Sequence, residues 1–241
     1  VPDDTVKENT ADVVINKKFV ATAKIARLFA DADALVAITH FKGHMITGFG
    51  GALKNLGMGC ATREGKLMQH NDVTPVFYED KCIGCGECEK ICPVGAVRVT
   101  DGKCALSKET CIGCGSCVGV CPAMALFVDL TAGDACQFKM VEYAYAALRG
   151  KERRSGFINF AVRINQECDC WGGENPRIAP DIGILASRDP VSIDKASMDL
   201  VNRACGKDIF REVHPEQNGM KQLEYAQELG LGSLEYELIE V

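Results

Sequence analysis

The sequence predicts an α/β domain that is interrupted by a small α+β insert. Two observations lead to this fold class. On both sides of the middle of the chain, segments in which apolar and polar residues alternate, as in strands, take turns with segments that have helical periodicity. The middle, residues 76–130, contains nine of the 14 cysteines in a duplicated pattern. We therefore expect a discontinuous host domain, residues 1–75 and 131–241, around an inserted module at 76–130.

The N-terminal part of the host domain contains three expected elements before its first long loop. ADVVINKKFV (11–20) is typical of a strand or hairpin, ATAKIARLFADA (21–32) of an amphipathic helix, and DALVAITH (33–40) of a buried strand. A glycine-rich loop follows, and GGALKNL (50–56) within it can begin a helix.

The C-terminal part of the host domain continues the alternation. DACQFKMVEYAYAALRG (134–150) predicts a helix with Asp134 as its cap and Gly150 as its stop. The remaining segments predict, in order, strands at SGFINFAVRIN (155–165) and DIGILAS (181–187), helices at SIDKASMDLVNRACG (192–206) and GMKQLEYAQELG (219–230), and a closing strand at LEYELIE (234–240). Strands separated by helices indicate a sheet with right-handed crossovers.

Composition excludes several classes of protein. The 241 residues have a net charge of -6, and the 27 lysines and arginines are scattered, which argues against a nucleic-acid partner. No apolar run approaches the roughly 18 residues that cross a bilayer, and the N-terminus has no secretory signal, so we expect a cytoplasmic protein without a membrane partner. Because the chain begins at Val1 in a polar stretch, we expect a processed product or a fragment.

The duplicated cysteine segment indicates metal ligation. CIGCGECEKICPVGAV (82–97) recurs as CIGCGSCVGVCPAMAL (111–126), identical at nine of sixteen positions with an offset of 29 residues. Each copy has the spacing C-x2-C-x2-C-x3-C-P, in which three thiolates hold one 4Fe-4S cluster and the fourth holds the other. This pattern assigns the first cluster to Cys82, Cys85, Cys88 and Cys121, and the second to Cys111, Cys114, Cys117 and Cys92.

Other uses of these cysteines explain the spacing less well. A zinc site needs only four ligands and does not require this doubled spacing, and disulfides do not require it either. The segment resembles the two-cluster bacterial ferredoxins, which completes the expected fold class: an α/β host domain with an inserted α+β ferredoxin-like module that binds two 4Fe-4S clusters. The resemblance implies electron transfer. Cys104 lies outside the repeated spacing and is interpreted as a small buried hydrophobic residue.

The loop at residues 40–70 is the expected ligand site of the host domain. It contains seven glycines and a group of cationic and polar residues, namely His40, Lys42, His44, Lys54, Asn55, Arg63, Lys66 and His70. Open α/β sheets bind ligands beyond the carboxyl ends of their strands, and the start of a helix favours an anion. We expect Lys42, Gly50, Gly51 and Asn55 to contact such a ligand. A glycine-rich turn with solvated charges is the alternative.

Two further resemblances concern the host domain. ADALVAITHFKGHMITGFGGALKNLGMGCATREGK (32–66), the cysteine module and CDCWGGENPRIAPDIGILASRDPVSIDKASMDLV (168–201) together resemble the uncharacterised iron-sulfur center proteins built on domain of unknown function 362. That family implies no settled activity, and its members usually have a further N-terminal segment. HMITGFGGALK (44–54), with His70 beyond it, is similar to the active-site segment of the lactate racemase family.

The racemase resemblance implies specific roles. His44 would be an acid/base group, Lys54 the attachment point of a nickel-pincer nucleotide, and His70 a metal ligand. An imidazole suits both proton transfer near neutral pH and nickel binding. An additional metal or a nucleotide cofactor is therefore a hypothesis for this loop.

The segment ECDCWGG (167–173) supplies two further candidate ligands. Cys168 and Cys170 follow an expected strand and should lie on the same side of the sheet as the histidine loop. They could bind a further metal, accept electrons or form an oxidisable pair, or they could be two half-buried thiols. Beyond them Asp181, Arg188, Asp189 and Asp194 either line the same cleft or cap a strand and a helix.

Three functions follow from these patterns. The first is an iron-sulfur oxidoreductase or electron-transfer component that relays electrons to a small-molecule substrate or cofactor in the loop at 40–70. The second is a non-catalytic electron carrier subunit that docks a redox partner protein, and it predicts no ligand in that loop. The third is a racemase-like or isomerase-like enzyme that uses a metal-nucleotide.

Overall fold

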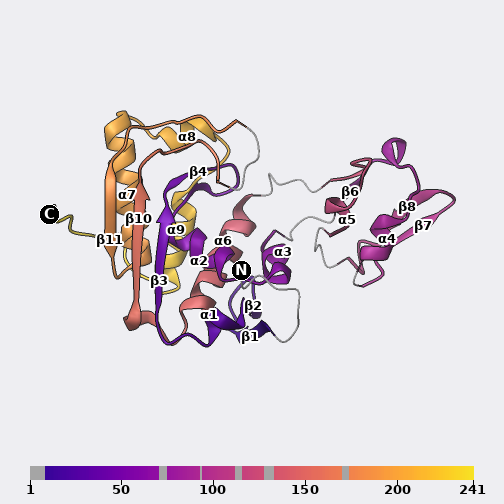
Figure 1. Cartoon of the computed structure of the whole chain (residues 1–241), viewed down its shortest axis with the longest axis horizontal. Coiled ribbons are helices and arrows are strands. Elements are labelled where there is room, and N and C mark those ends of the chain that lie inside the picture. Colours follow the sequence, from indigo (N-terminus) through magenta and orange to yellow (C-terminus); the bar gives the residue numbers. More distant parts are fainter. Residues whose placement is uncertain (1–8, 71–74, 93, 112–115, 128–132, 170–173) are drawn as a thin grey trace. The chain divides into compact units, whose positions relative to one another are not determined.

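The computed structural model describes residues 9–70, 75–92, 94–111, 116–127, 133–169 and 174–241 (Figure 1). The chain forms two compact units. The first comprises residues 1–65 and 133–241, and the second comprises residues 66–132. Each has its own hydrophobic core.

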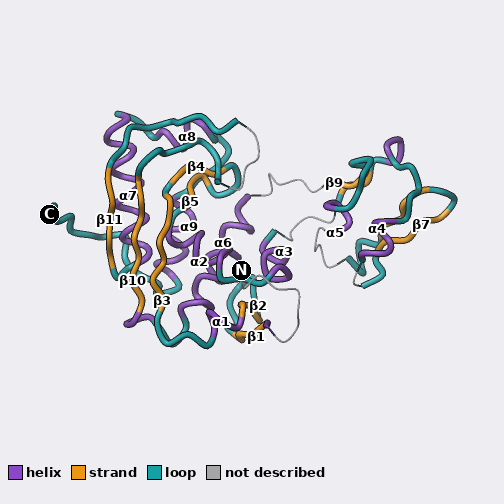
Figure 2. Tube along the Cα trace, in the orientation of Figure 1, coloured by secondary structure: helices purple, strands orange, loops and turns teal. Residues whose placement is uncertain are grey.

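A three-stranded mixed sheet organises the first unit. Its strands are β3 (Leu35–His40), β10 (Ser155–Ala161) and β11 (Gly183–Ser187), in the order β11-β10-β3 (Figure 2). β10 runs parallel to β3 and antiparallel to β11. The carboxyl ends of β3 and β10 therefore lie at the same edge, and the loops that follow them can meet there.

Helices cover one face of this sheet. α2 (Ala52–Gly59) contacts β3 and β10, and α7 (Pro190–Cys205) contacts β10 and β11. α6 (Gly133–Leu148) packs on α2, and α9 (Met220–Glu228) packs on α6. At the α2 and α6 contact, a Cβ atom on Gly57 would lie 2.2 Å from the carbonyl oxygen of Met140, so only glycine allows this approach.

The opposite face of the sheet is more exposed than the sequence predicted. Segment 33–40 was expected to be a buried strand, and it does form β3, but Val36 and Ile38 are 68% and 64% exposed. Ile184 on β11 is 62% exposed on the same face. The helices pack on the face that carries Ala37, so every second residue of β3 stays in contact with solvent.

Two expected elements of the first unit were wrong. Segment 21–32 forms strand β2 (Thr22–Ala26) and only a short helix α1 (Arg27–Ala30). The strand wins because β1 (Thr10–Val14) pairs with it antiparallel, which places Asp12 opposite Lys24 in a 2.8 Å ion pair. Segment 234–240 forms no strand, and its apolar Leu238 and Ile239 are exposed.

The remaining helices and strands of the first unit are short. β4 (Lys42–His44) and β5 (Gly48–Gly50) form a hairpin after β3, and α8 (Ile209–Val213) contacts β5. α3 (Arg63–Gln69) begins in the first unit and ends in the second, and a 3-10 turn, Glu152–Arg154, precedes β10.

The second unit contains short strands and helical turns. Its elements are β6 (Val76–Phe77), a 3-10 turn Glu79–Lys81, α4 (Glu87–Ile91), β7 (Val97–Thr100), β8 (Lys103–Leu106), α5 (Ser116–Gly119) and β9 (Leu126–Phe127). β6 pairs with β9 and β7 pairs with β8, both antiparallel. The β7–β8 hairpin turns through Asp101 and Gly102, which have φ values of 52° and 74°, as a tight hairpin requires.

Candidate functional site

The cysteines expected to hold the first cluster line one pocket in the second unit. Cys82, Cys85 and Cys88 come from the first repeat, and Cys121 comes from the second. The other wall residues are small or apolar, namely Ile83, Gly84, Gly86, Val99, Cys104, Ala123, Ala125 and Leu126. The fold thus gathers residues from both copies around one mostly apolar space.

Glycines shape the loop that carries the first three thiols. Gly84 has φ +68°, and a Cβ atom there would lie 2.4 Å from the carbonyl oxygen of Gly102 in the β7–β8 turn. Gly86 has φ +76° and immediately precedes α4. Glycine is therefore needed at Gly84 both for its backbone conformation and for the close packing of the loop.

Backbone N-H groups point at the fourth cysteine of each repeat. Ala96 N donates to Cys92 Sγ at 3.2 Å, and Ala125 N donates to Cys121 Sγ at 3.2 Å. Burial is the largest single influence on the pKa of Cys92 and by itself would raise it. Four backbone N-H groups together outweigh burial, so the pKa lies below its usual value; they belong to Val94, Val97, Ala96 and Gly95. Donors arranged in this way stabilise a thiolate, the form that binds metal.

The four cysteines line a small pocket that encloses about 10 Å³. Among the described residues, no three His, Cys, Asp or Glu side chains are grouped closely enough to hold a single metal ion. A 4Fe-4S cluster would be held by one thiolate at each of its four irons. Of the second set, Cys111 is half-buried, Cys117 is buried, and Cys114 lies outside the described residues.

Cys104 is a pocket residue that the sequence analysis did not place there. It is buried, as predicted for a small hydrophobic residue, but it lines the same pocket as Cys88 and packs in the same buried cluster. Burial, reinforced by the neighbouring thiols, raises the pKa of Cys104 to about 12. The contact could not be read from the spacing, because Cys104 lies in the strand between the two repeats.

The first unit has a second pocket, at the carboxyl ends of β3 and β10. Its volume is about 270 Å³, and it is lined by Ile38, Thr39, His40, Lys42, Gly51, Lys54, Asn55, Met58, Gly59 and Asp169. Three of the four residues expected to contact a ligand therefore lie together, Lys42, Gly51 and Asn55, and Lys54 lies with them. Gly50 is adjacent, since a Cβ atom there would lie 3.0 Å from Lys54 Cδ.

Asp169 joins the two loops that form this pocket. Its carboxylate lies 2.8 Å from His40 Nδ1 and 3.2 Å from Lys42 Nζ. Burial is the largest influence and raises the pKa of Asp169, but Lys42 and His40 outweigh it and hold the pKa below its usual value. His40 Nε2 lies 3.0 Å from the carbonyl oxygen of Val162. Because a carboxylate and a carbonyl only accept, His40 makes both hydrogen bonds only as the imidazolium.

Lys54 and Cys168 form the second contact between the loops. Lys54 Nζ donates to Cys168 Sγ at 2.9 Å, and an ammonium at this distance stabilises the thiolate. The two loops were expected on the same side of the sheet, and this contact brings them together. Cys170 lies outside the described residues.

The N-terminus of α2 is capped by the protein itself. Asp194 Oδ1 accepts from Ala52 N at 2.6 Å, and Oδ2 accepts from Leu53 N at 2.9 Å. Asn159 Nδ2 donates to the same carboxylate at 2.8 Å. These hydrogen bonds lower the pKa of Asp194, but burial outweighs them and raises it to about 6. A ligand anion at this helix start would therefore compete with Asp194 for those N-H groups.

The other singled-out side chains have local roles or lie apart from this pocket. His44 is buried, and its Nδ1 accepts from Ile46 N and Thr47 N. His70 follows α3, in the stretch 66–132 that belongs to the second unit, whereas His44 and Lys54 belong to the first. Of the later polar residues, Asp189 caps α7, Asp181 pairs with Arg177, and Arg188 donates to the carbonyl oxygen of Arg153.

Comparison with known proteins identifies a family. The family described as Domain of unknown function (DUF362) matches residues 2–199. No curated protein and no solved structure matches the chain. In the described part of the chain, no helix is long and apolar enough to cross a membrane.

Proposed function

The chain belongs to the DUF362 family, and we propose that it is an iron-sulfur oxidoreductase or electron-transfer component that binds two 4Fe-4S clusters. The observation that carries this proposal is the shared pocket of Cys82, Cys85, Cys88 and Cys121. Spacing alone pairs three cysteines of one repeat with one of the other, and the fold gathers this same set. A zinc site needs only four ligands and does not require the doubled spacing of the two repeats.

Each cluster, once bound, would take up and release one electron at a time. The protein supplies the surroundings. The eight thiolates hold the irons, the N-H groups of Ala96 and Ala125 reduce the negative charge at sulfur, and the apolar wall limits contact with water. The described residues of both repeats support this arrangement, and Cys114 belongs to it by the repeat.

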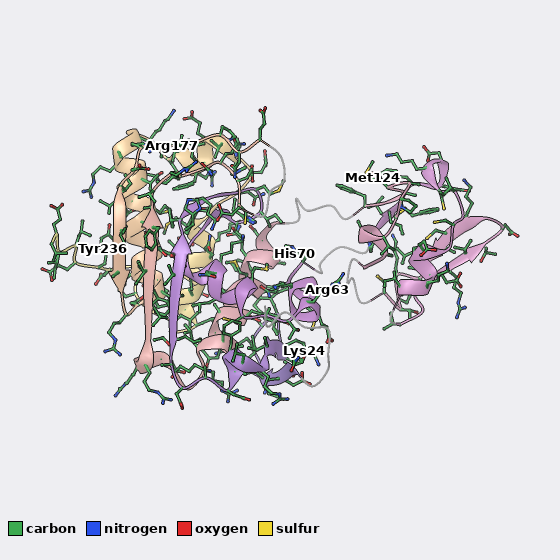
Figure 3. All side chains as sticks on the ribbon, in the orientation of Figure 1. Lys24, Arg63, His70, Met124, Arg177 and Tyr236 are labelled. Atoms are coloured by element: carbon green, nitrogen blue, oxygen red, sulfur yellow. The ribbon has the colours of Figure 1, made fainter. Side chains whose placement is uncertain are left out.

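A redox partner has a suitable surface beside the first cluster site. Ile83 lies between two pocket residues and is 67% exposed, and Met124 is 75% exposed at the surface of the second unit (Figure 3). Met124 N donates to the carbonyl oxygen of Cys121 at 3.2 Å, so the backbone of Met124 contacts that of an expected cluster ligand. Exposed apolar residues of this kind favour contact with a protein.

The pocket of the first unit supports a catalytic role beyond electron carriage. A cavity of about 270 Å³ has room for a small molecule, and Lys42, Asn55 and Met58 offer charge, hydrogen bonds and apolar contact. The Lys54 and Cys168 pair places a nucleophilic or oxidisable thiol next to this ligand position. A pure electron carrier would need no such pocket.

The first experiment is elemental analysis of anaerobically purified protein, with iron, sulfide, nickel and zinc measured in one sample. We expect about eight irons and eight sulfides per chain, and the spectrum of a reduced 4Fe-4S cluster after dithionite. Stoichiometric zinc without sulfide would contradict the proposal. Stoichiometric nickel in addition to iron would instead favour the metal-nucleotide hypothesis for Lys54 and His70.

A further inference from the structure

The pocket of the first cluster contains a fifth cysteine. Cys104 lies on β8, is 5% exposed, and lines the same wall as the four expected ligands. It belongs to one buried cluster with Cys88 and Cys117, and Cys88 lines the same pocket. The eight-cysteine pattern is complete without it, so its position is not explained by the proposed ligand set.

The two cluster sites differ at this position. Subtracting the repeat offset of 29 from 104 gives position 75, which is Pro75. Proline has no side chain that can bind iron, so the second site has no equivalent of Cys104. Packing alone would be satisfied by alanine or valine on this wall, as it is at Val99 and Ala125.

We propose that Cys104 is a reserve ligand of the first cluster, able to take the place of Cys88; this rests on the proposed cluster binding. The exchange involves no electron transfer. The Cys104 sulfur loses its proton as it bonds to the iron, the bond from that iron to the Cys88 sulfur breaks, and Cys88 takes up a proton. The first site can thereby keep all four irons when the Cys88 thiol is lost, and the repeat gives the second site no counterpart of Cys104.

Iron content of four variants tests this inference. We expect about eight irons in the wild type and about eight in Cys88→Ala, because Cys104 completes the ligand set. Cys88→Ala/Cys104→Ala should fall to about four. Cys111→Ala, which removes a ligand of the second site, should fall to about four as a single substitution. Cys104→Ala should retain about eight, because Cys104 is not a ligand while Cys88 is present.

The outcomes separate this inference from the proposed function. A wild type without iron and sulfide would overturn both. A wild type with about eight irons and a Cys88→Ala variant that loses four, or that shows the oxidised spectrum of a 3Fe-4S cluster, overturns the reserve ligand alone. Loss of iron in Cys104→Ala also overturns it. If Cys88→Ala is insoluble, the same comparison is made after anaerobic refolding with iron and sulfide.

Discussion

The two pockets of this protein are built by different rules. In the second unit, four cysteines that two copies of one fixed spacing supply, Cys82, Cys85, Cys88 and Cys121, line one pocket. In the first unit, the contacts that form the pocket join residues far apart in the chain: Lys54 to Cys168 over 114 positions and His40 to Asp169 over 129. Local spacing therefore encodes the first kind of site, and only the packing of the sheet creates the second.

The sharpest way to break this comparison is to remove one thiol that crosses between repeats. Cys121→Ala should lower the iron content from about eight to about four, because Cys121 serves the cluster of the other repeat. The remaining signal should belong to the cluster held by Cys111 and its partners. Iron analysis and electron paramagnetic resonance of the reduced protein measure both. Cys205→Ala, a thiol on α7 outside the repeats, is the matched control and should retain all the iron. Full retention in Cys121→Ala/Cys104→Ala, in which Cys104 cannot replace the lost thiol, would refute the crossed ligand set.

The buried cap of α2 should give the largest effect on stability. Asp194→Ala leaves Ala52 N and Leu53 N without their acceptor in the core and removes one of the two acceptors of Asn159 Nδ2, which keeps Ser197 Oγ. We expect the free energy of unfolding of the first unit to fall by about 3–5 kcal/mol, as for other broken buried networks. Urea unfolding followed by circular dichroism measures it. Asp181→Ala, which removes an exposed pair with Arg177, should cost less than about 1 kcal/mol. Equal losses of unfolding free energy in the two variants would show that the buried cap contributes no more than an exposed ion pair.

The Lys54 and Cys168 pair should control the reactivity of a thiol. Lys54→Met removes the ammonium 2.9 Å from Cys168 Sγ, so less thiolate is present at neutral pH. We expect alkylation of Cys168 by iodoacetamide at pH 7 to slow severalfold, because the ammonium that favours the reactive thiolate is gone. Peptide mass spectrometry gives the rate, with Cys205 as the internal reference. Lys207→Met, an exposed lysine paired with Glu212, is the control and should leave the rate unchanged. An unchanged rate in Lys54→Met would remove the functional argument for the pair.

The smallest expected effect concerns pH. The pKa of Asp194 is raised to about 6 in the folded protein, so the folded state retains this proton at pH values where the unfolded chain has lost it. The contribution of Asp194 to stability therefore decreases as pH rises through 6, by about 1 kcal/mol between pH 5 and 7. Urea unfolding of the wild type and of Asp194→Asn at several pH values isolates this contribution. A difference between the two proteins that does not change with pH would contradict it.

Much of the fold could be predicted, with errors that have physical causes. The helices near 134–150, 192–206 and 219–230 and the strands near 155–165 and 181–187 form close to their expected places, because their patterns are long and bounded by glycine. The helix predicted at 21–32 was wrong, because the short pattern of this segment fits a strand as well as a helix. Pairing with β1 favours the strand. The strand predicted at 234–240 does not form, because an alternation of apolar and polar residues does not by itself provide a neighbouring strand to pair with.

The candidate sites divide in the same way. The sequence by itself predicted which cysteines share a pocket and which loop supplies Lys42, Lys54 and Asn55 to the other pocket, since both depend on spacing or on the end of one strand. It could not show that Asp169 holds His40, that Asp194 occupies the start of α2, or that Cys104 faces Cys88. Those contacts join separate elements across the fold. Only tertiary packing decides them, because a side chain's partner depends on which elements lie next to each other and on their register.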